Sequence, residues 1–544
     1  MTENKESQIG ALNEHKVESP QTETALEQRI KSEMLFSFKD EIVLGIVAPV
    51  GANLSAFEDQ INRHLPDYGY ESNVVKLSDF LKSEGPIAGI TIDNTSLVKR
   101  YDSLMTAGNQ VRKRTGANDF LAKYAIGRIA ATRELDARNP KPLKGKIHIL
   151  HSLKHTDEVE TLRGVYGAGF FLIGVYCPEA QRLLNLQSNG ATYEDAAHLI
   201  QRDYDEKETF GQQTSKVFEL SDVFIRLDLY NLESTSSQVE RFLDLAFGNS
   251  FHTPTQDENA MFLAYAASLR SGSLSRQVGV VITSESGDVI ATGTNDVPKY
   301  GGGLYSPGTE DQRDFARGYD SNVIQRNRII DEVVQRIGDF TAQTLVNKLK
   351  EAGMISDENK AKELYNPESL RQESQEILKG ASILDLTEFG RDVHAEMEAL
   401  LCCARISVSP KNGTLFTTTF PCHNCAKHIV ASGIKRVVYV EPYPKSKAKE
   451  LHSDSLVIES DLEDAARVLF DHFVGIGPRR YFDLFSLSLS TGRVLKRKRA
   501  DGRKDSWFKQ DASPRVQMSP LSYLDREKRI TQSMNQEKKG LERK

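Results

Sequence analysis

The sequence predicts an α/β protein with two domains. Its 544 residues, 39% of them hydrophobic, are enough for two or three globular cores. Buried-strand patterns alternate with helical stretches through the first half, an order typical of a doubly wound parallel sheet. In the second half an antiparallel hairpin precedes helices and further strands, which predicts a second domain with α/β/α layers.

We expect a flexible leader at residues 1–35, a first domain at 36–250, a second domain at 251–490 and a basic tail at 491–544. The leader is polar and charged, and it contains no apolar signal segment.

An insertion at about 299–393 interrupts the second domain. Amphipathic patterns predict helices within it at 324–337 and 345–352. Such an insertion either covers a pocket or forms an oligomer interface, and the sequence does not choose between the two.

The first domain opens with a buried-strand pattern at 41–47, a glycine-containing loop and a helix at 56–65. A strand, loop and helix in this order can cradle phosphate with backbone amides at the helix N-terminus. The candidate nucleotide-binding residues are those of the loop: Gly51, Ala52, Asn53, Leu54 and Ser55. Leu54 stands where the full motif has a Lys, so a plain turn between strand and helix is the alternative.

Further strands are predicted at 146–153, 169–175 and 221–225, with helical stretches between them. Through Ser152–His155 and Glu158–Arg163, this half resembles P-loop nucleotide and deoxynucleotide kinases. The resemblance implies a P-loop-kinase-like domain that binds a nucleotide. The missing loop lysine favours a regulatory role over phosphoryl transfer.

The second domain begins with strands at 277–282 and 289–293, joined by a turn at Gly287. Arg276 is a candidate substrate contact, because a guanidinium group binds phosphate through two hydrogen bonds. The alternative for Arg276 is a surface ion pair.

The segments Ser275–Gly279 and Thr292–Pro298 resemble the opening of deoxycytidylate deaminases. The resemblance implies that Asn295 helps to hold the sugar and phosphate side of a nucleotide. A turn residue in the left-handed conformation is the alternative for Asn295.

His394 and Glu396 form a His-x-Glu pair, and Pro421, Cys422 and Cys425 form a Pro-Cys-x-x-Cys motif. This combination is the signature of zinc-dependent cytosine and adenine deaminases. His394, Cys422 and Cys425 would bind one Zn²⁺ and leave its fourth position to water, while Glu396 would move protons during catalysis. A structural zinc knuckle or a pair of buried thiols is the alternative, but a structural zinc site normally has four protein ligands.

Local patterns place this motif at the starts of two helices. An apolar repeat predicts a helix that begins at His394, and a β-rich segment at 413–419 is followed by Pro421, which suits the start of the next helix. A helix N-terminus favours the thiolate form of a cysteine. Another strand is predicted at 436–440, as expected for a cytidine-deaminase-like α/β/α domain.

A glycine-rich loop at 473–481 carries two further cations, Arg479 and Arg480. We expect them near the substrate phosphates, with ordinary surface arginines as the alternative. The remaining cysteines are expected to be small core residues: Cys177, Cys402 and Cys403.

Five cysteines in 544 residues, without a secretory leader, predict a reduced cytoplasmic protein. The longest apolar runs are far too short to cross a bilayer, so no membrane association is expected.

The formal net charge is −6, but the charges are unevenly distributed. From Thr491 to Lys544 there are 16 Lys or Arg and 7 Asp or Glu, an excess of nine, which leaves −15 for the rest of the chain. The cluster Lys496–Arg499 is the densest. Such a tail is either a solvated segment or a surface for RNA, DNA or nucleotide phosphates.

The kinase-like half, the deoxycytidylate-type motifs and the insertion together resemble the bacterial anti-phage dCTP deaminases, over roughly residues 40–490. The resemblance implies hydrolysis of free deoxycytidine nucleotides to deoxyuridine nucleotides, which depletes dCTP for an infecting phage. It also implies activity that is held in check before infection, with a regulatory nucleotide, a regulatory RNA and a homo-oligomer as candidate partners.

Three other functions compete with this interpretation: a housekeeping dCMP deaminase, a nucleic-acid cytosine deaminase, and a non-enzymatic module that senses nucleotides or is regulated by RNA. The acidic body of the chain argues against a polymer substrate, which needs an extended positive channel. The complete His, Cys and Glu set argues against a non-enzymatic module.

Overall fold

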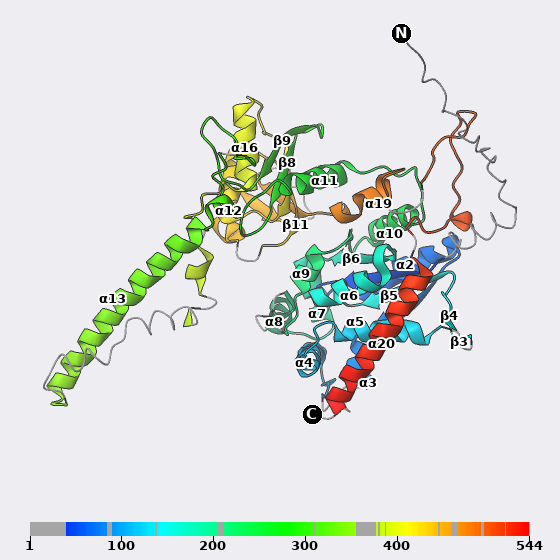
Figure 1. Ribbon diagram of the computed structural model, residues 1–544, viewed down its shortest axis with the longest axis horizontal. Helices are drawn as coiled ribbons and strands as arrows, with labels where there is room; N and C mark the ends of the chain where they lie inside the picture. Colours follow the sequence, from blue (N-terminus) through cyan, green and yellow to red (C-terminus); the bar gives the residue numbers. More distant parts are fainter. Residues whose placement is uncertain are drawn as a thin grey trace, which may run out of the picture.

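The structure is a computed structural model. It describes residues 40–83, 90–133, 135–136, 139–204, 206, 210–308, 310–354, 377–378, 381–386, 388–443, 446–459, 466–490, 494–516 and 518–542. The predicted leader lies outside the described residues, as does part of the predicted insertion. Figure 1 shows a sheet-containing body for each half and one long helix that projects from the C-terminal half.

The first sheet has six strands in the order β14-β7-β6-β1-β5-β2. Its strands are β1 (Ile42–Val47), β2 (Glu71–Lys76), β5 (Lys146–His151), β6 (Phe170–Tyr176), β7 (Val223–Arg226) and β14 (Gly475–Ile476). All neighbours pair in parallel except β14, which is antiparallel to β7. The predicted doubly wound parallel sheet is therefore confirmed, with β2 as a strand that the sequence patterns did not reveal.

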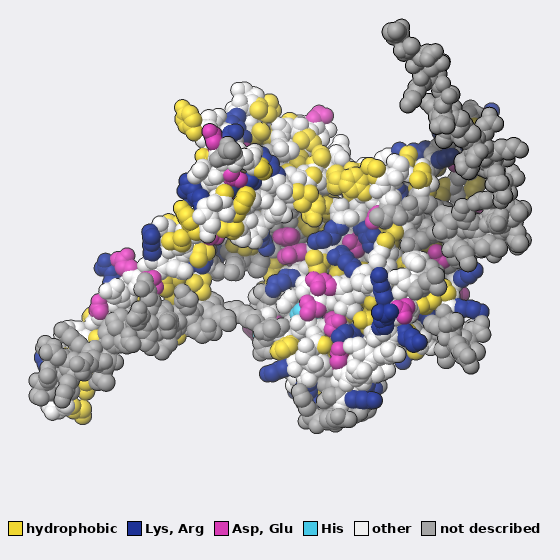
Figure 2. All heavy atoms as spheres, viewed as in Figure 1, with side chains coloured by type: hydrophobic (Ala, Val, Ile, Leu, Met, Phe, Trp, Pro, Cys, Tyr) yellow, Lys and Arg dark blue, Asp and Glu magenta, His cyan; other side chains and the backbone are white. Residues whose placement is uncertain are grey.

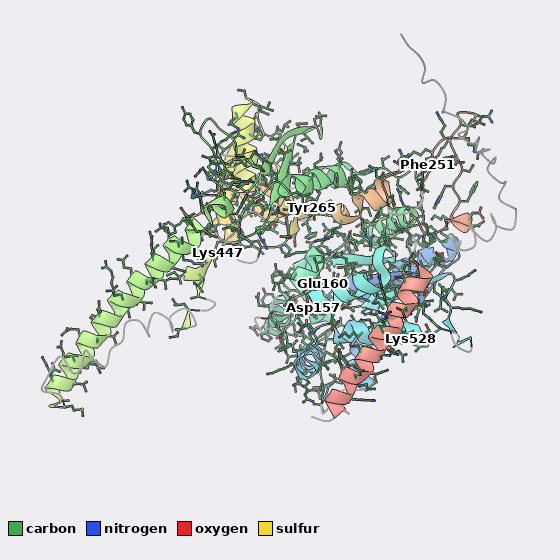
Figure 3. The ribbon with its side chains drawn as sticks, in the orientation of Figure 1. Asp157, Glu160, Phe251, Tyr265, Lys447 and Lys528 are labelled. Atoms are coloured by element: carbon green, nitrogen blue, oxygen red, sulfur yellow. The ribbon has the colours of Figure 1, made fainter. Side chains whose placement is uncertain are left out.

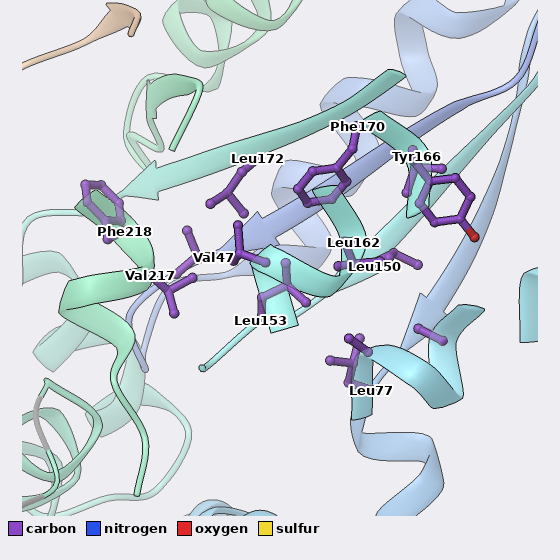
Figure 4. Packing of buried hydrophobic residues seen from close by; sticks show 14 of the residues in the cluster. Val47, Leu77, Leu150, Leu153, Leu162, Tyr166, Phe170, Leu172, Val217 and Phe218 are labelled. Atoms are coloured by element: carbon purple, nitrogen blue, oxygen red, sulfur yellow. The ribbon is translucent and has the colours of Figure 1, made fainter. Parts of the chain in front are cut away.

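Helices cover both faces of this sheet. Val43 and Val47 of β1 pack into one hydrophobic core with α4, α5 and α6, whereas Ile42, Leu44 and Ile46 pack into another with α2 and α10. The helices of this half are α2 (Leu54–His64), α3 (Ser78–Ser83), α4 (Leu97–Thr115), α5 (Phe120–Ala131), α6 (Thr156–Tyr166), α7 (Glu179–Ser188), α8 (Tyr193–Tyr204), α9 (Thr214–Glu219) and α10 (Leu232–Ala246), and a small hairpin is formed by β3 (Leu135–Asp136) and β4 (Asn139–Pro140). Figure 4 shows the first of these cores, with side chains from several strands and helices in contact.

The second sheet has the order β12-β13-β11-β10-β8-β9. Its strands are β8 (Gly279–Thr283), β9 (Val289–Thr294), β10 (Thr414–Thr419), β11 (Arg436–Glu441), β12 (Leu456–Ile458) and β13 (Val468–His472). The predicted hairpin is β8 and β9, and the strands from β10 onward pair in parallel. The helices of this half are α11 (Gln256–Ser268), α12 (Asp314–Arg317), α13 (Ser321–Glu351), α16 (Ala395–Arg405), α17 (His423–Ser432), α18 (Ala448–Leu451) and α19 (Tyr481–Phe485).

This sheet lies between helices, as an α/β/α arrangement requires. Val280 and Ile282 of β8 face the core that contains residues of α16 and α17, and Val281 faces the core that contains residues of α11.

The two halves share one core and one sheet edge. Gly475 and Ile476 leave the second sheet and pair with β7 of the first. Beside them, the buried ring of His472 stacks on Tyr176 of β6 at 4.9 Å between centroids. The first sheet is thus completed by residues from the other half, so the predicted boundary at 250/251 does not separate two independent cores.

Helix α13 is one continuous 31-residue helix where the sequence predicts two shorter ones. No proline interrupts it, and the glycine between the predicted segments, Gly338, is tolerated within the helix. It extends away from the rest of the molecule (Figure 1). Hydrophobic side chains lie on its surface among charged ones (Figure 2), including Ile337, Phe340 and Leu345.

The C-terminal segment folds back on the first half. Helix α20 (Pro520–Glu542) packs against α5, α4 and α6. Glu527 accepts hydrogen bonds from Arg133 at 2.7 and 2.9 Å, and Arg133 also pairs with Glu41 of the first half at 2.7 Å. The region predicted as a basic tail therefore contributes buried charges to the first domain, while Lys528 on the outer side of α20 stays exposed (Figure 3).

Among the described helices, none has a stretch that is both long and apolar enough to cross a membrane.

The Arg133 network generates a stability prediction. Replacing Glu527 with Ala leaves the guanidinium group of Arg133 buried with one carboxylate fewer, and breaking such a buried pair costs about 3–5 kcal/mol. Asp525→Ala, on the same helix, removes only the exposed pair with Arg529 and should change stability by less than about 0.5 kcal/mol. Guanidinium-induced unfolding followed by circular dichroism compares the two, and equal midpoints would contradict the structural role of Glu527.

Candidate metal centre

Three metal-binding side chains meet where two helices begin. His394 is the N-cap residue of α16, and Cys422 is the N-cap residue of α17, whose first turn contains Cys425. The Cys422 sulfur accepts a hydrogen bond from the backbone N–H of Cys425 at 3.4 Å. Both helix N-termini thus point their positive ends toward the same space, which favours anionic sulfur there.

The distances within this group fit a tetrahedral zinc site. His394 Nδ1 lies 3.4 Å from the sulfur of Cys422 and 3.4 Å from that of Cys425, and the three ligand atoms all lie within 4.8 Å of one another. Zinc bonded to nitrogen and sulfur at its usual lengths separates such atoms by roughly 3.5 Å. In the part of the chain that the structure describes, no fourth His, Cys, Asp or Glu joins the group, so three protein ligands leave one position open.

Glu396 lies beside this group without belonging to it. It sits in the first turn of α16 and is only 5% exposed. Burial, and then the negative charge of Cys422, raise the pKa of Glu396 above its ordinary value. The hydrogen bond with Cys425, together with His394, lowers the pKa of Cys422 to about 4. The site therefore combines an anionic sulfur with a carboxyl group that readily holds a proton.

Two backbone contacts fix the position of α16. A Cβ atom on Gly293 would lie 2.1 Å from the carbonyl oxygen of Ala395, so only glycine allows this helix to start so close to β9. Beside it, the N–H of Val393 donates to the carbonyl oxygen of Asp296 at 2.9 Å. These contacts bring the segment after β9 next to His394, although Asp296 and His394 are 98 positions apart in the sequence.

Residues 254–441 match the family model of the cytidine and deoxycytidylate deaminase zinc-binding region. The C-terminal half contains a deaminase zinc-binding domain. Zinc is accordingly the cofactor that this domain implies, in agreement with the donor set and its geometry.

Two curated relatives match parts of the deaminase domain. The deoxycytidylate deaminase of Enterobacteria phage T2 is 46% identical over 56 residues, which are 10% of this chain and 30% of that protein. ComE operon protein 2 of Bacillus subtilis (strain 168) is 36% identical over 74 residues, 13% of this chain and 39% of that protein. The chain thus spans well under half the length of these relatives.

Among solved structures, the dCMP deaminase from the cyanophage S-TIM5, in complex with dCMP and dUMP, is similar to this chain with a TM-score of 0.22 and 17% identity. The similarity covers 41% of this chain and 100% of that one.

Asn295 precedes Asp296, which bridges to Val393, and it uses its own side chain internally. Its Oδ1 accepts the N–H of Val278 at 2.8 Å, and its Nδ2 donates to the carbonyl oxygen of Arg276 at 2.8 Å. It is buried and has no positive φ, so the alternative of a left-handed turn residue is wrong. In the deaminase domain Asn295 fixes the segment before β8, and any contact with substrate would use its remaining hydrogen-bonding capacity.

The three candidate arginines have different surroundings. Arg276 is half exposed and forms a 3.5 Å ion pair with Glu441. Arg479 is exposed and lines a small cavity with Gln277 and Glu441. Of the three, Arg276 and Arg479 keep access to solvent.

Arg480 is predicted to lie near the substrate phosphates, but the structure places it elsewhere. It is buried, donates to the carbonyl oxygen of Phe170 at 2.5 Å and pairs with Asp483 at 2.9 Å. Its guanidinium carbon also lies 4.7 Å from the ring centroid of Phe171. The structure thus uses Arg480 to join the two halves, because its position after β14 carries it onto the first sheet.

The sequence patterns missed a group of charged residues that supports the metal ligands. Arg391, three residues before His394, pairs with Asp314 at 2.7 Å, and Arg313 pairs with Asp296 at 3.7 Å. Part of the insertion therefore holds the strand segments on which the site depends. No spacing rule identifies such pairs, since they join residues that are far apart in the sequence.

The five loop residues, Gly51 to Ser55, lie in the first half and line a different cavity. The structure therefore separates the predicted residues into a metal centre and a second candidate site.

The metal centre yields a direct prediction. We expect about one zinc per chain in the wild type and a large loss of bound zinc in Cys422→Ala and in Cys425→Ala, because two remaining ligands hold the metal weakly. Cys402→Ala, on α16 but outside the ligand group, is the matched control and should keep its zinc. Metal analysis of the dialysed proteins measures this, and wild-type zinc in both ligand variants would refute the assignment.

Proposed function

We propose that this protein is a zinc-dependent deaminase of free deoxycytidine nucleotides, dCTP and also dCMP, which it hydrolyses to deoxyuridine nucleotides. The observation that carries the proposal is the position of the buried Glu396 beside a three-ligand metal group with an open fourth position. The match to the cytidine and deoxycytidylate deaminase zinc-binding region supports the reaction class.

His394, Cys422 and Cys425 would hold the zinc ion, which supplies a Lewis acid that makes a bound water acidic near neutral pH. Glu396 accepts a proton from the water that attacks C4 of cytosine. It delivers this proton to N3, and it then moves a second proton from the C4 hydroxyl of the adduct to the departing amino group as the C4–N bond breaks. Ammonia leaves, and the ring becomes uracil.

The surroundings of Glu396 suit this role. Its burial excludes bulk water from the carboxyl group and keeps the protonated form accessible. Its place at the start of a helix that is packed directly on β9 limits its movement. Arg276 and Arg479 would bind the substrate phosphates, because they are the candidate cations that retain exposure.

We further propose that the activity depletes dCTP in defence against phage. The first half would bind a regulatory nucleotide through Gly51, Ala52, Asn53, Leu54 and Ser55. Homo-oligomerisation is supported by the exposed hydrophobic side chains of α13, and the exposed cluster Lys496–Arg499 would be the contact for a regulatory RNA.

The proton-transfer role predicts the effect of one carboxylate. Glu396→Gln should lower ammonia release from dCTP by at least about a hundredfold, because it removes the group that exchanges the proton, while zinc content stays unchanged. Glu398→Gln, on the same helix, alters a carboxylate that pairs with Arg405 and should keep most of the activity. Substantial turnover by Glu396→Gln with full zinc occupancy would assign the proton transfer to another group.

The choice between free nucleotide and polymer can also be measured. We expect ammonia release from dCTP and dCMP to exceed that from a cytosine-containing single-stranded oligonucleotide. The double variant Lys496→Ala and Lys498→Ala should leave this preference unchanged, since it removes two exposed cations without disturbing α20. Faster deamination of the oligonucleotide, lost in the double variant, would favour a nucleic-acid deaminase.

A further inference from the structure

A cavity of about 470 Å³ opens at the carboxyl ends of the parallel strands β1, β2 and β5. Open α/β sheets bind ligands at this edge, and the volume lies in the range of small-molecule sites. Residues 48–55 form one side of the cavity, and α4 contributes apolar side chains such as Leu97, Leu104 and Met105. The cavity thus combines a loop of backbone amides with an apolar wall.

Lys154 brings to this loop the positive charge that position 54 lacks. It follows β5 by three residues, and its Nζ donates to the carbonyl oxygen of Ala48 at 2.8 Å. The ammonium group therefore lies at the start of the loop, although it comes from a different strand. A lysine in this position can serve a phosphate as a point charge.

An internal carboxylate accepts hydrogen bonds from one backbone N–H of the loop and from Lys154. Asp203 of α8 accepts the backbone N–H of Val50 at 2.7 Å through Oδ2 and the Nζ of Lys154 at 2.7 Å through Oδ1. Thr214 donates to the same Oδ1 at 3.1 Å, and Asp203 is 1% exposed. A carboxylate thus contacts the loop amide and the lysine that an incoming phosphate oxygen would contact.

Buried polar atoms without a partner line the same cavity. Within the described chain, Nε of Arg112 and Oε1 of Gln212 have no hydrogen-bond partner, although these residues are 1% and 7% exposed. The hydroxyl of Ser152 is likewise unpartnered. All three residues line the cavity. Because unpartnered buried donors and acceptors are costly, their gathering here points to a polar ligand.

We propose that this cavity binds the phosphate group of a nucleotide, with Lys154 as the cation of the loop and Asp203 as an internal anion that the phosphate displaces. The inference rests on the nucleotide-binding part of the proposed function and adds the two residues that control it. Displacement of Asp203 would release α8, on which the preceding residue, Arg202, pairs with Glu206 and with Asp102 of α4. Phosphate binding would therefore change the contacts between α8 and α4, the helices that cover the cavity.

Full-length protein should be titrated calorimetrically with ATP, dATP, dGTP and dTTP, none of which contains cytosine, and with tripolyphosphate and adenosine to separate phosphate from base. Lys154→Ala should weaken binding of the phosphate-bearing ligands about tenfold or more, and Lys113→Ala, an exposed lysine on α4, should not. Asp203→Asn, which removes the competing charge, should strengthen binding about tenfold. Asp195→Asn, at an exposed position on the same helix and outside the cavity lining, is its matched control.

Hydrogen exchange of residues 48–55 in the wild type, with and without nucleotide, adds a readout that needs no variant and covers the case in which Asp203→Asn does not fold. Protection by nucleotide, with the affinity changes above, supports the inference. If nucleotide protects residues 48–55 from exchange but Lys154→Ala and Lys113→Ala bind it with equal affinity, the inference is overturned. The proposed nucleotide site is then retained. If no ligand binds or protects this loop, both the inference and the proposed nucleotide site fail.

Discussion

The antiparallel pairing of β14 with β7 is the contact on which the arrangement of the two halves depends. Only Gly475 and Ile476 take part, but they bring the chain after the second sheet onto the edge of the first. The rings of Tyr176 and His472 and the buried Arg480 then pack between the halves. Because these groups are buried together, the two halves share one packed interface.

Two features of the local helix geometry position the metal ligands. A helix start exposes N–H groups and positive potential, and both α16 and α17 start at the ligand cluster. Gly293 allows the first of these helices to lie directly against the sheet, so Glu396 and His394 are held together. Backbone packing therefore contributes to bringing the ligands together.

Some charged residues that a sequence count treats as surface charges are buried and paired in the structure. Arg133, Arg480 and Arg515 are all buried and bonded to carboxylates or carbonyl oxygens of their own chain. Of these three, only Arg515 lies in the basic C-terminal segment, where most of the other described Lys and Arg side chains are exposed. The cluster Lys496–Arg499 is one exposed part of this segment that an anionic partner could contact.

The α/β class, the strands with strong apolar runs and the candidate metal ligands could be predicted without the structure, since these features depend on local periodicity and short motifs. His394, Cys422 and Cys425 were predictable as candidate ligands because His-x-Glu followed by Pro-Cys-x-x-Cys is a recognisable motif. The role of Arg480, the buried pairing of Glu527 and the contact of Asp203 with Val50 were decided only by the tertiary structure. Each joins residues that are distant in the chain, and no local pattern specifies which distant partner a buried charge will meet.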